Sequence, residues 1–294
     1  MQRRMRALLP NQKSAPYYFI APLFIIFSLF IVYPIVDSFI MSFQTFKAGK
    51  YLFAGLDNYA TLVRDPVFLI TLKNTLIYLI IQVPVMVVLS LGLASLLDTR
   101  GLRGKALFRT GLFLPSVTAL VAYSLVFKLL LNADYGFINF LLSKVGIAPV
   151  DWLNSRIGAR ASIILSMTWR WTGYNMIIMI AGLQAIPQDI YEAASIDGAS
   201  AWQKFVRITI PMMRSIILFV SVTSTIGTFQ LFDESYVLTA GGPNNATITM
   251  AHYLYNTGFR YFKFGYAAAI SYAMVLIILL LSVLQFKLGG DEDA

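Results

Sequence analysis

Six long apolar segments limit what this chain can fold into. Each is about as long as the 20 or so apolar residues that an α-helix needs to cross the hydrocarbon core of a bilayer. They run approximately Tyr17–Met41, Phe68–Leu97, Leu107–Leu131, Ala161–Leu183, Ser215–Leu238 and Phe264–Phe286. We therefore predict an all-α, polytopic membrane protein with six transmembrane helices, forming a single domain over residues 1–294.

The composition agrees with that class and excludes several others. Hydrophobic residues make up 58% of the chain and charged residues 13%, far from the average of soluble proteins. The net charge of +9 lies beside apolar segments, which indicates membrane orientation and not nucleic-acid binding. The chain has no cysteine, and His252 is its single histidine. Disulfides, thiol catalysis and thiolate or histidine-cluster metal sites are thereby excluded, and no catalytic or metal-binding residue is predicted.

Basic residues predict the orientation by their density more than by their number, because the opposite loops also carry bases. They crowd the N-terminal tail, as Arg3, Arg4, Arg6 and Lys13, and the connection 98–109, as Arg100, Arg103, Lys105 and Arg109. The first apolar segment is too long for a signal peptide and lacks a cleavage site, so we count it as a retained helix. Six helices then place both termini on one side, which the positive-inside rule makes cytoplasmic.

The connection between the fourth and fifth segments, residues 187–211, is polar and has its own helix signals. Pro187 suits a first helical turn, and Gln188–Ile196 has the length and pattern of a short helix. Gly198 can adopt the left-handed conformation that ends a helix, and Ser200 can cap a second helix that Pro211 limits. We predict a helix–turn–helix at the cytoplasmic membrane surface and call it the elbow.

The elbow resembles the EAA loop of the membrane subunits of binding-protein-dependent ABC importers. That pattern is Glu-Ala-Ala, three residues, Gly, nine residues, then Ile-x-Leu-Pro. The residues in register here are Glu192, Ala193, Ala194, Asp197, Gly198, Ala199, Phe205, Ile208 and Pro211. Ile210 replaces the common Leu, and Ser215 stands where many members have a second Pro, so a straighter start of the next helix is expected. The alternative is an amphipathic loop helix that packs on the bundle without a partner.

The resemblance implies the type I ABC importer permease fold, in the maltose-type carbohydrate-uptake branch and similar to its first permease. It further implies a bacterial cytoplasmic membrane, a homologous second permease, two ATPase subunits and an external solute-binding protein. Glu192, Ala193, Ala194, Asp197, Gly198 and Ala199 would then couple the chain to the ATPase. The chain would bind no cofactor and would not be an enzyme, since ATP and Mg belong to the partner. The stretch Gly101–Lys105 is no phosphate loop, because Thr99 and Ala106 stand where that motif needs Gly and Ser or Thr.

Polar side chains inside the fourth and fifth segments indicate where a substrate could pass, because such groups are costly in lipid. Ser221, Ser224, Thr225 and Thr228 recur on one helical face. The predicted path consists of Arg170, Trp171, Tyr174, Asn175, Ser224, Thr228 and Gln230. Two alternatives remain open: hydrogen bonds of the hydroxyls to other helices or to the backbone, and a structural ion pair or interfacial anchor for Arg170.

The predicted substrate is a sugar or neutral oligosaccharide, because hydroxyls and an amide can replace water around sugar hydroxyls while an aromatic ring stacks on the sugar. If Arg170 faces the path, an acidic or phosphorylated sugar or polyol is the alternative. An ion-coupled secondary transporter is less favoured, because we find no carboxylate near a helix centre and no internal repeat.

Two further sequence features concern contacts. Gly241–Asn245 is a dense turn signal, and the resemblance implies that it lies toward the binding protein, although a plain turn is the alternative. Gly265, Ala269 and Ala273 form a stripe of small residues along the sixth segment, which permits close approach of another helix.

Overall fold

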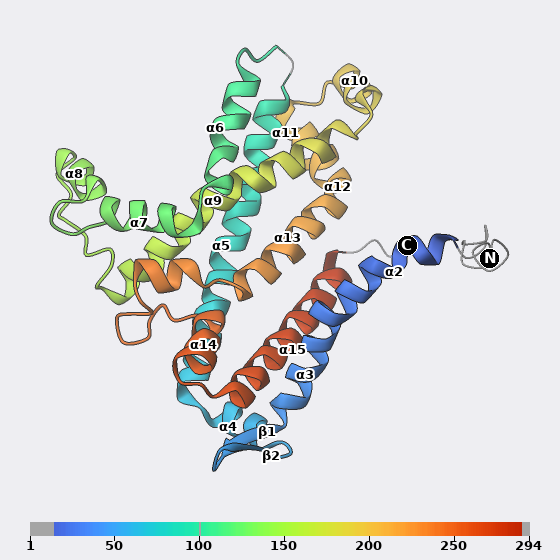
Figure 1. The fold of residues 1–294 in the computed structure, drawn as a ribbon. Coiled ribbons are helices and arrows are strands. Elements are labelled where there is room, and N and C mark those ends of the chain that lie inside the picture. The colour runs from blue at the N-terminus through green and yellow to red at the C-terminus, as the bar shows by residue number, and fades with distance from the viewer. Residues whose placement is uncertain (1–14, 100, 290–294) are drawn as a thin grey trace, which may run out of the picture. The chain divides into compact units, whose positions relative to one another are not determined.

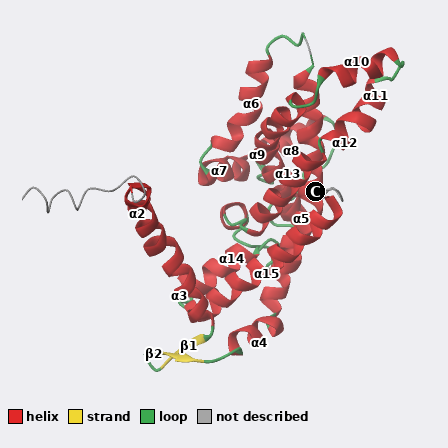
Figure 2. Ribbon diagram, turned by 90° about the vertical axis from the view of Figure 1, so that its right-hand side faces the viewer, coloured by secondary structure: helices red, strands yellow, loops and turns green. Residues whose placement is uncertain are grey.

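The computed structural model describes residues 15–99 and 101–289, and they are almost entirely helical (Figures 1 and 2). Arg3, Arg4, Arg6, Lys13 and Arg100, on which much of the charge argument rests, lie outside the described residues. The chain divides into two compact units. The first comprises residues 15–62 with Thr257–Tyr272, and the second comprises Val63–Asn256 with the residues from Ala273 onward.

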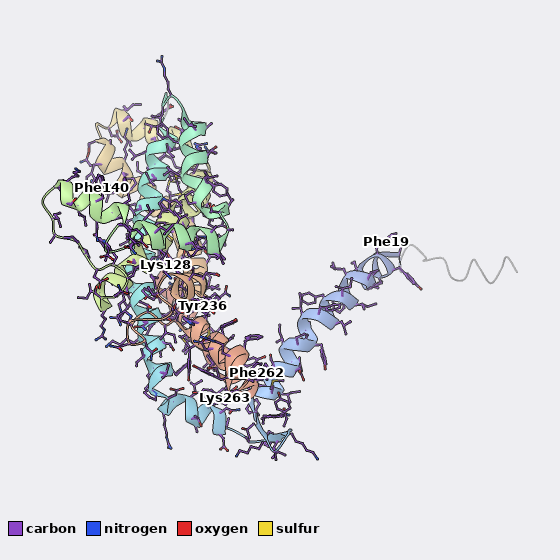
Figure 3. The ribbon with its side chains drawn as sticks, turned by 60° about the vertical axis from the view of Figure 1, so that its left-hand side comes forward. Phe19, Lys128, Phe140, Tyr236, Phe262 and Lys263 are labelled. Carbon is purple, nitrogen blue, oxygen red and sulfur yellow. The ribbon has the colours of Figure 1, made fainter. Side chains whose placement is uncertain are left out.

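The first unit is built on the first apolar helix. This helix consists of α2 (Ala15–Phe27), a π-helical turn η1 (Ser28–Val32) and α3 (Tyr33–Ser42). Its side chains are mostly exposed, as Phe19 illustrates in Figure 3, so lipid or another subunit must cover them. Tyr272 of α15 (Phe264–Gly289) donates a hydrogen bond of 2.6 Å to the carbonyl of Ile35 and so fixes the two helices together.

A short hairpin follows the first helix within this unit. Strands β1 (Gln44–Lys47) and β2 (Lys50–Phe53) pair antiparallel, and α4 (Asp57–Arg64) comes next. The side-chain amide of Asn58 donates to the carbonyls of Ser42 and Gln44 at 2.8 and 2.9 Å. Gly265 lies so close to this turn that a Cβ would stand 2.1 Å from the Gln44 carbonyl oxygen. The first residue of the small-residue stripe therefore contacts this chain itself.

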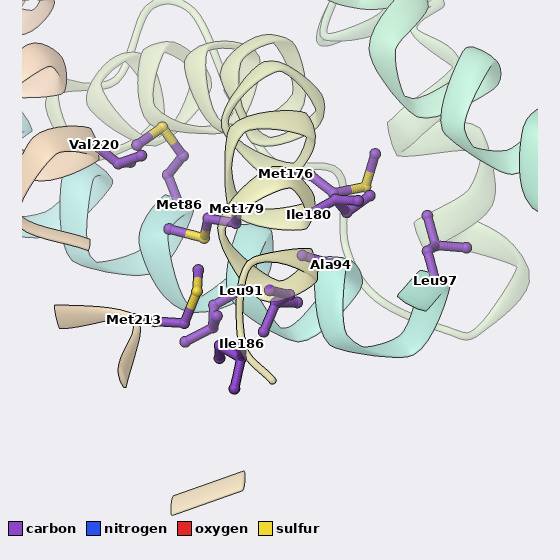
Figure 4. Close-up of a cluster of buried hydrophobic side chains, with 11 residues drawn as sticks. Met86, Leu91, Ala94, Leu97, Met176, Met179, Ile180, Ile186, Met213 and Val220 are labelled. Atoms are coloured by element: carbon purple, nitrogen blue, oxygen red, sulfur yellow. The ribbon is translucent and has the colours of Figure 1, made fainter. Parts of the chain in front are cut away.

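The second unit is organised around two long helices, α5 (Pro66–Asp98) and α9 (Arg156–Gln184). Side chains cap both of them: Asp65 accepts from the N–H of Val67 at 2.8 Å, and Ser155 accepts from the N–H of Gly158 at 3.0 Å. Their contact is filled largely by methionine and aliphatic side chains, which pack well into irregular gaps (Figure 4). The shorter helices of the unit are α6 (Lys105–Val117), α7 (Leu120–Leu130), α8 (Phe137–Lys144), α13 (Arg214–Phe229), π-helical η3 (Glu234–Leu238), α14 (Met250–Tyr255) and the start of η4 (Asn256–Arg260).

The predicted helices are present, but two of them are broken. Ala15–Ser42, Pro66–Asp98 and Phe264–Gly289 are long and apolar enough to span a membrane without interruption. The predicted helix 107–131 is divided into α6 and α7, which meet at 100°. Pro115 in the last turn of α6 removes a backbone donor there, which weakens the helix. The predicted helix 215–238 also stops early, at Phe229, and only the π-helical turn η3 follows. If α6 with α7, and Ala201–Met212 with Arg214–Phe229, are each counted as one bent span, the described residues give up to five spans, and α9 lies at the predicted fourth span.

The elbow has the predicted helix–turn–helix form. It consists of α10 (Gln188–Ile196), a turn at Gly198 with φ +78°, and then α11 (Ala201–Lys204), η2 (Phe205–Thr209) and α12 (Ile210–Met212). Ser200 caps α11, and Gln203 completes a reciprocal capping box. The second arm of the elbow meets α13 at 66°.

Candidate functional site

A pocket lies between α5, α9 and α13, within the second unit. It has a volume of about 220 Å³. Its walls combine two aromatic rings, two amides, three hydroxyl side chains, two thioethers and a glycine: Gln82, Met86, Met167, Trp171, Tyr174, Asn175, Thr223, Ser224, Gly227 and Thr228. The lining is mostly apolar and carries a small number of polar groups, which is typical of a site for a small organic solute.

The aromatic wall is held in a defined arrangement. The rings of Trp171 and Tyr174 meet edge to face, with their centroids 5.8 Å apart. The side-chain amide of Asn175 donates to the carbonyl of Trp171 at 3.0 Å and lies 3.1 Å from the sulfur of Met86. The pocket therefore presents a preset aromatic surface beside amide and thioether groups.

The hydroxyl wall comes from α13. The hydroxyl of Thr228 donates to the carbonyl of Ser224 at 2.8 Å. In the same way, the hydroxyl of Ser221 donates to the carbonyl of Ile217, and that of Thr225 to the carbonyl of Ser221. The backbone alternative for these hydroxyls is thus confirmed for three of the four. Their oxygens still accept hydrogen bonds, so Thr228 can bind a solute hydroxyl as an acceptor.

Five of the seven predicted path residues line this pocket together: Trp171, Tyr174, Asn175, Ser224 and Thr228. Gln230 does not, because α13 ends at Phe229 and the Gln230 side chain is exposed beyond it. Sequence reasoning missed Gln82, Met86, Met167, Thr223 and Gly227. Gln82 was detectable, since it is an amide within the second apolar segment next to Pro84.

Arg170 does not line this pocket. Its side chain is only 6% exposed and reaches the break between α6 and α7. Nη1 donates to the carbonyl of Thr118 at 2.9 Å and Nη2 to the carbonyl of Ser116 at 3.2 Å. The described residues that line the pocket include no Asp, Glu, Lys or Arg. This pocket lining therefore offers no cation to the acid group of a sugar.

The six predicted coupling residues lie together on α10 and the turn that follows it. Glu192 and Asp197 are exposed, and so are the apolar side chains of Ile196 and Trp202, at 87% and 71%. The hydroxyls of Tyr191 and Thr209 are 2.9 Å apart and join the two arms of the elbow. The elbow is thus internally braced and presents an uncovered mixed surface, as a docking element would.

Side chains fix the 241–249 loop, which contains the Gly-Gly-Pro turn, to the helical core. Asn74 of α5 donates to the carbonyls of Asn245 and Ile248 at 2.8 and 3.0 Å. Arg160 of α9 donates to Asn74 Oδ1 at 2.7 Å and to the carbonyl of Ala246 at 3.0 Å. Asn244, at the tip of the turn, is exposed. The turn is therefore a rigid projection of the second unit.

Known proteins similar to this chain are transport permeases. It is 46% identical over 281 residues to a lactose transport system permease protein of Rhizobium radiobacter, covering 94% of each chain. It is 37% identical over 292 residues to an arabinooligosaccharide transport system permease protein of Bacillus subtilis, covering 99% of this chain and 93% of that one. A trehalose/maltose transport system permease protein of Thermococcus litoralis is 33% identical over 279 residues, with 93% and 92% covered.

Two solved structures share the fold. One is a bacterial ABC transporter that imports the acidic polysaccharide alginate, with a TM-score of 0.83, 22% identity, and 95% of this chain and 96% of that chain covered. The other is an alginate ABC transporter in complex with its alginate pentasaccharide-bound periplasmic protein, with a TM-score of 0.82, 23% identity, and 94% of each chain covered. The model of the family described as binding-protein-dependent transport system inner membrane component matches residues 74–288. The chain belongs to that family and has the fold of an ABC importer permease.

Proposed function

We propose that this chain forms one half of the translocation path of an ATP-driven importer for a neutral sugar or oligosaccharide. The pocket between α5, α9 and α13 carries this proposal, because it combines ring faces, amides and hydroxyls without formal charge. Aromatic faces stack on the apolar face of a sugar ring, and amides exchange hydrogen bonds with its hydroxyls. The relatives named for lactose, arabinooligosaccharides and trehalose/maltose support the same substrate class.

The pocket of this chain does not favour an acidic or phosphorylated sugar. Recognition of a carboxylate or phosphate normally uses an arginine or lysine. Arg170, the cation nearest in sequence to the aromatic wall, instead donates to two backbone carbonyls.

The elbow supports the rest of the assembly. In this proposal, Glu192–Ala199 dock into a cleft of an ATPase that binds ATP and Mg, and a homologous second permease completes the path. The chain itself performs no covalent chemistry and binds no cofactor. Both termini and the elbow face the cytoplasm, while the 241–249 loop faces an external binding protein. The exposed Ile196 and Trp202 supply the apolar contact that such docking needs.

The decisive experiment compares two neighbouring tryptophans. Trp171 lines the pocket, whereas Trp169 is 47% exposed and packs against Phe127 with ring centroids 5.3 Å apart. Each is changed to Leu, and uptake is measured in proteoliposomes that contain the second permease, the ATPase and the binding protein. The labelled probe is the sugar recovered from the purified binding protein. Loss of ring stacking should lower uptake by Trp171→Leu about tenfold.

Trp169→Leu is the matched control and should transport nearly normally once uptake is scaled to the amount of assembled complex. Equal uptake by the two variants would show that the pocket is not the sugar path.

A further inference from the structure

Arg170, Tyr123 and Glu234 form a buried polar cluster outside the pocket. They come from α9, α7 and the first residue of η3, and their exposed fractions are 6%, 2% and 3%. A charged group at such burial needs a partner, because an unpaired buried charge is strongly destabilising. The contacts of the cluster show which partners are used.

The guanidinium of Arg170 occupies the break in the third span. Its two donated bonds end on the carbonyls of Ser116 and Thr118, where α6 stops and the chain turns by 100° into α7. The last carbonyls of a helix have no acceptor role within the helix and carry its partial negative charge. A planar, permanently charged fork is suited to satisfying two of them at once.

Tyr123 contacts an acidic side chain as well as Arg170. The Arg170 guanidinium stands over the ring of Tyr123 at 4.7 Å from its centroid, and the Tyr123 hydroxyl donates to the carboxylate of Glu234. Arg170 and Glu234, both described residues, form no direct ion pair. Tyr123 therefore contacts both Arg170 and Glu234 and links them.

The cluster also contacts the pocket wall. The guanidinium lies 5.5 Å from the ring centroid of Trp171, the next residue on α9 and part of the pocket lining. One side chain thus contacts a lining residue and the broken span, which belong to segments far apart in the sequence.

We infer that Arg170 is a positioning residue for transport, which holds the α6–α7 break in one geometry with Glu234 as its countercharge across Tyr123. The inference does not depend on which solute uses the pocket. A break stabilised by side-chain hydrogen bonds can be released and re-formed as the permease changes state. The bent third span is then a defined joint.

The first test concerns charge balance. Arg170→Met leaves Glu234 without its countercharge, and Glu234→Gln leaves Arg170 without it. The double variant removes both charges and retains an amide that can accept from Tyr123. In the complex co-expressed with its second permease and ATPase, either single variant should lower the yield of heat-stable complex, and the double variant should recover much of it. A double variant no better than Arg170→Met would overturn the countercharge.

The second test separates positioning from stability. Arg170→Lys keeps the positive charge but cannot donate as a planar fork to both carbonyls. A single cysteine at Ala119, which is exposed in the break, reports the local geometry in this cysteine-free chain. Its maleimide labelling rate in assembled Arg170→Lys complex should change on the order of tenfold, which matches the loss of one charged hydrogen bond.

A cysteine at Leu107, which is 76% exposed on α6 away from the break, is the control and should label equally in both backgrounds. Arg170 would be a merely structural residue if Ala119→Cys reacts at the wild-type rate in assembled Arg170→Lys complex. Sugar uptake is not measured in either test, so failure here leaves the proposed function untouched.

Discussion

Replacing Gly198 with valine should weaken docking of the ATPase without unfolding the permease. Gly198 adopts φ +78°, a conformation that L-residues with a Cβ disfavour. A Cβ at this position would meet no atom within 4 Å, so the substitution creates no clash. The penalty is therefore backbone strain alone, about 1–2 kcal/mol. That strain corresponds to a factor of roughly 5 to 30 in the population that keeps the present angle between the two arms of the elbow.

The assay is titration of purified ATPase onto the permease pair in lipid nanodiscs. The dissociation constant of Gly198→Val should rise by up to that factor, and ATP hydrolysis stimulated by the binding protein should fall in parallel. Gly198→Asn should lie nearer the wild type, because asparagine tolerates the left-handed region better than valine does.

Gly146→Val is the matched control for strain. Gly146, in the connection between α8 and α9, has φ +77°, and a Cβ added there would likewise meet no atom within 4 Å. It carries the same backbone penalty away from the elbow and should leave ATPase affinity unchanged. Unaltered docking of Gly198→Val, or an equal loss in Gly146→Val, would refute the coupling role of the elbow angle.

Two other predictions follow from the fold. A cysteine at Gln203 should resist an impermeant reagent in intact cells, whereas one at Asn244 should react, since both positions are exposed and the proposed topology puts them on opposite sides; labelling of Gln203 from outside would reverse that topology. Gly173→Ala would place a Cβ 1.7 Å from the carbonyl oxygen of Leu112, so α6 and α9 must separate. The folding free energy should fall by about 1–3 kcal/mol, and the melting temperature should fall with it. Gly92→Ala, with no atom within 4 Å, is its control, and identical melting of the two variants would show that the helices are not in backbone contact there.

The elbow could be predicted in detail because its signals are local. The left-handed turn depends on one residue, Gly198, and the helix cap on Ser200, so neighbouring residues are sufficient to specify them. The angle to α13 was missed. It is set where Met213, fully buried between the helices of the second unit, joins the two segments, and such packing is not visible in a local pattern.

The third span shows why the remainder of the site could not be predicted. Apolar residues continue through Val117 and Leu120, and Pro115 indicates a weak point in the helix but not a bend of 100°. The break is stabilised by Arg170, more than fifty residues later in the chain. The same contact shows what a local pattern leaves open: the sequence places Arg170 beside Trp171, but it does not tell which distant groups accept hydrogen bonds from the guanidinium.

The bracing of the 241–249 loop has a consequence for the kinetics of recognition. Asn74 and Arg160 hold its carbonyls, and Thr247 within the loop is fully buried, with its hydroxyl 2.7 Å from that of Thr239. A loop fixed in this way has already lost its conformational entropy during folding of the permease, so a partner that binds it does not have to order it. Association at this turn should therefore resemble contact between two rigid bodies, with an encounter rate set by orientation and charge and little affected by loop folding.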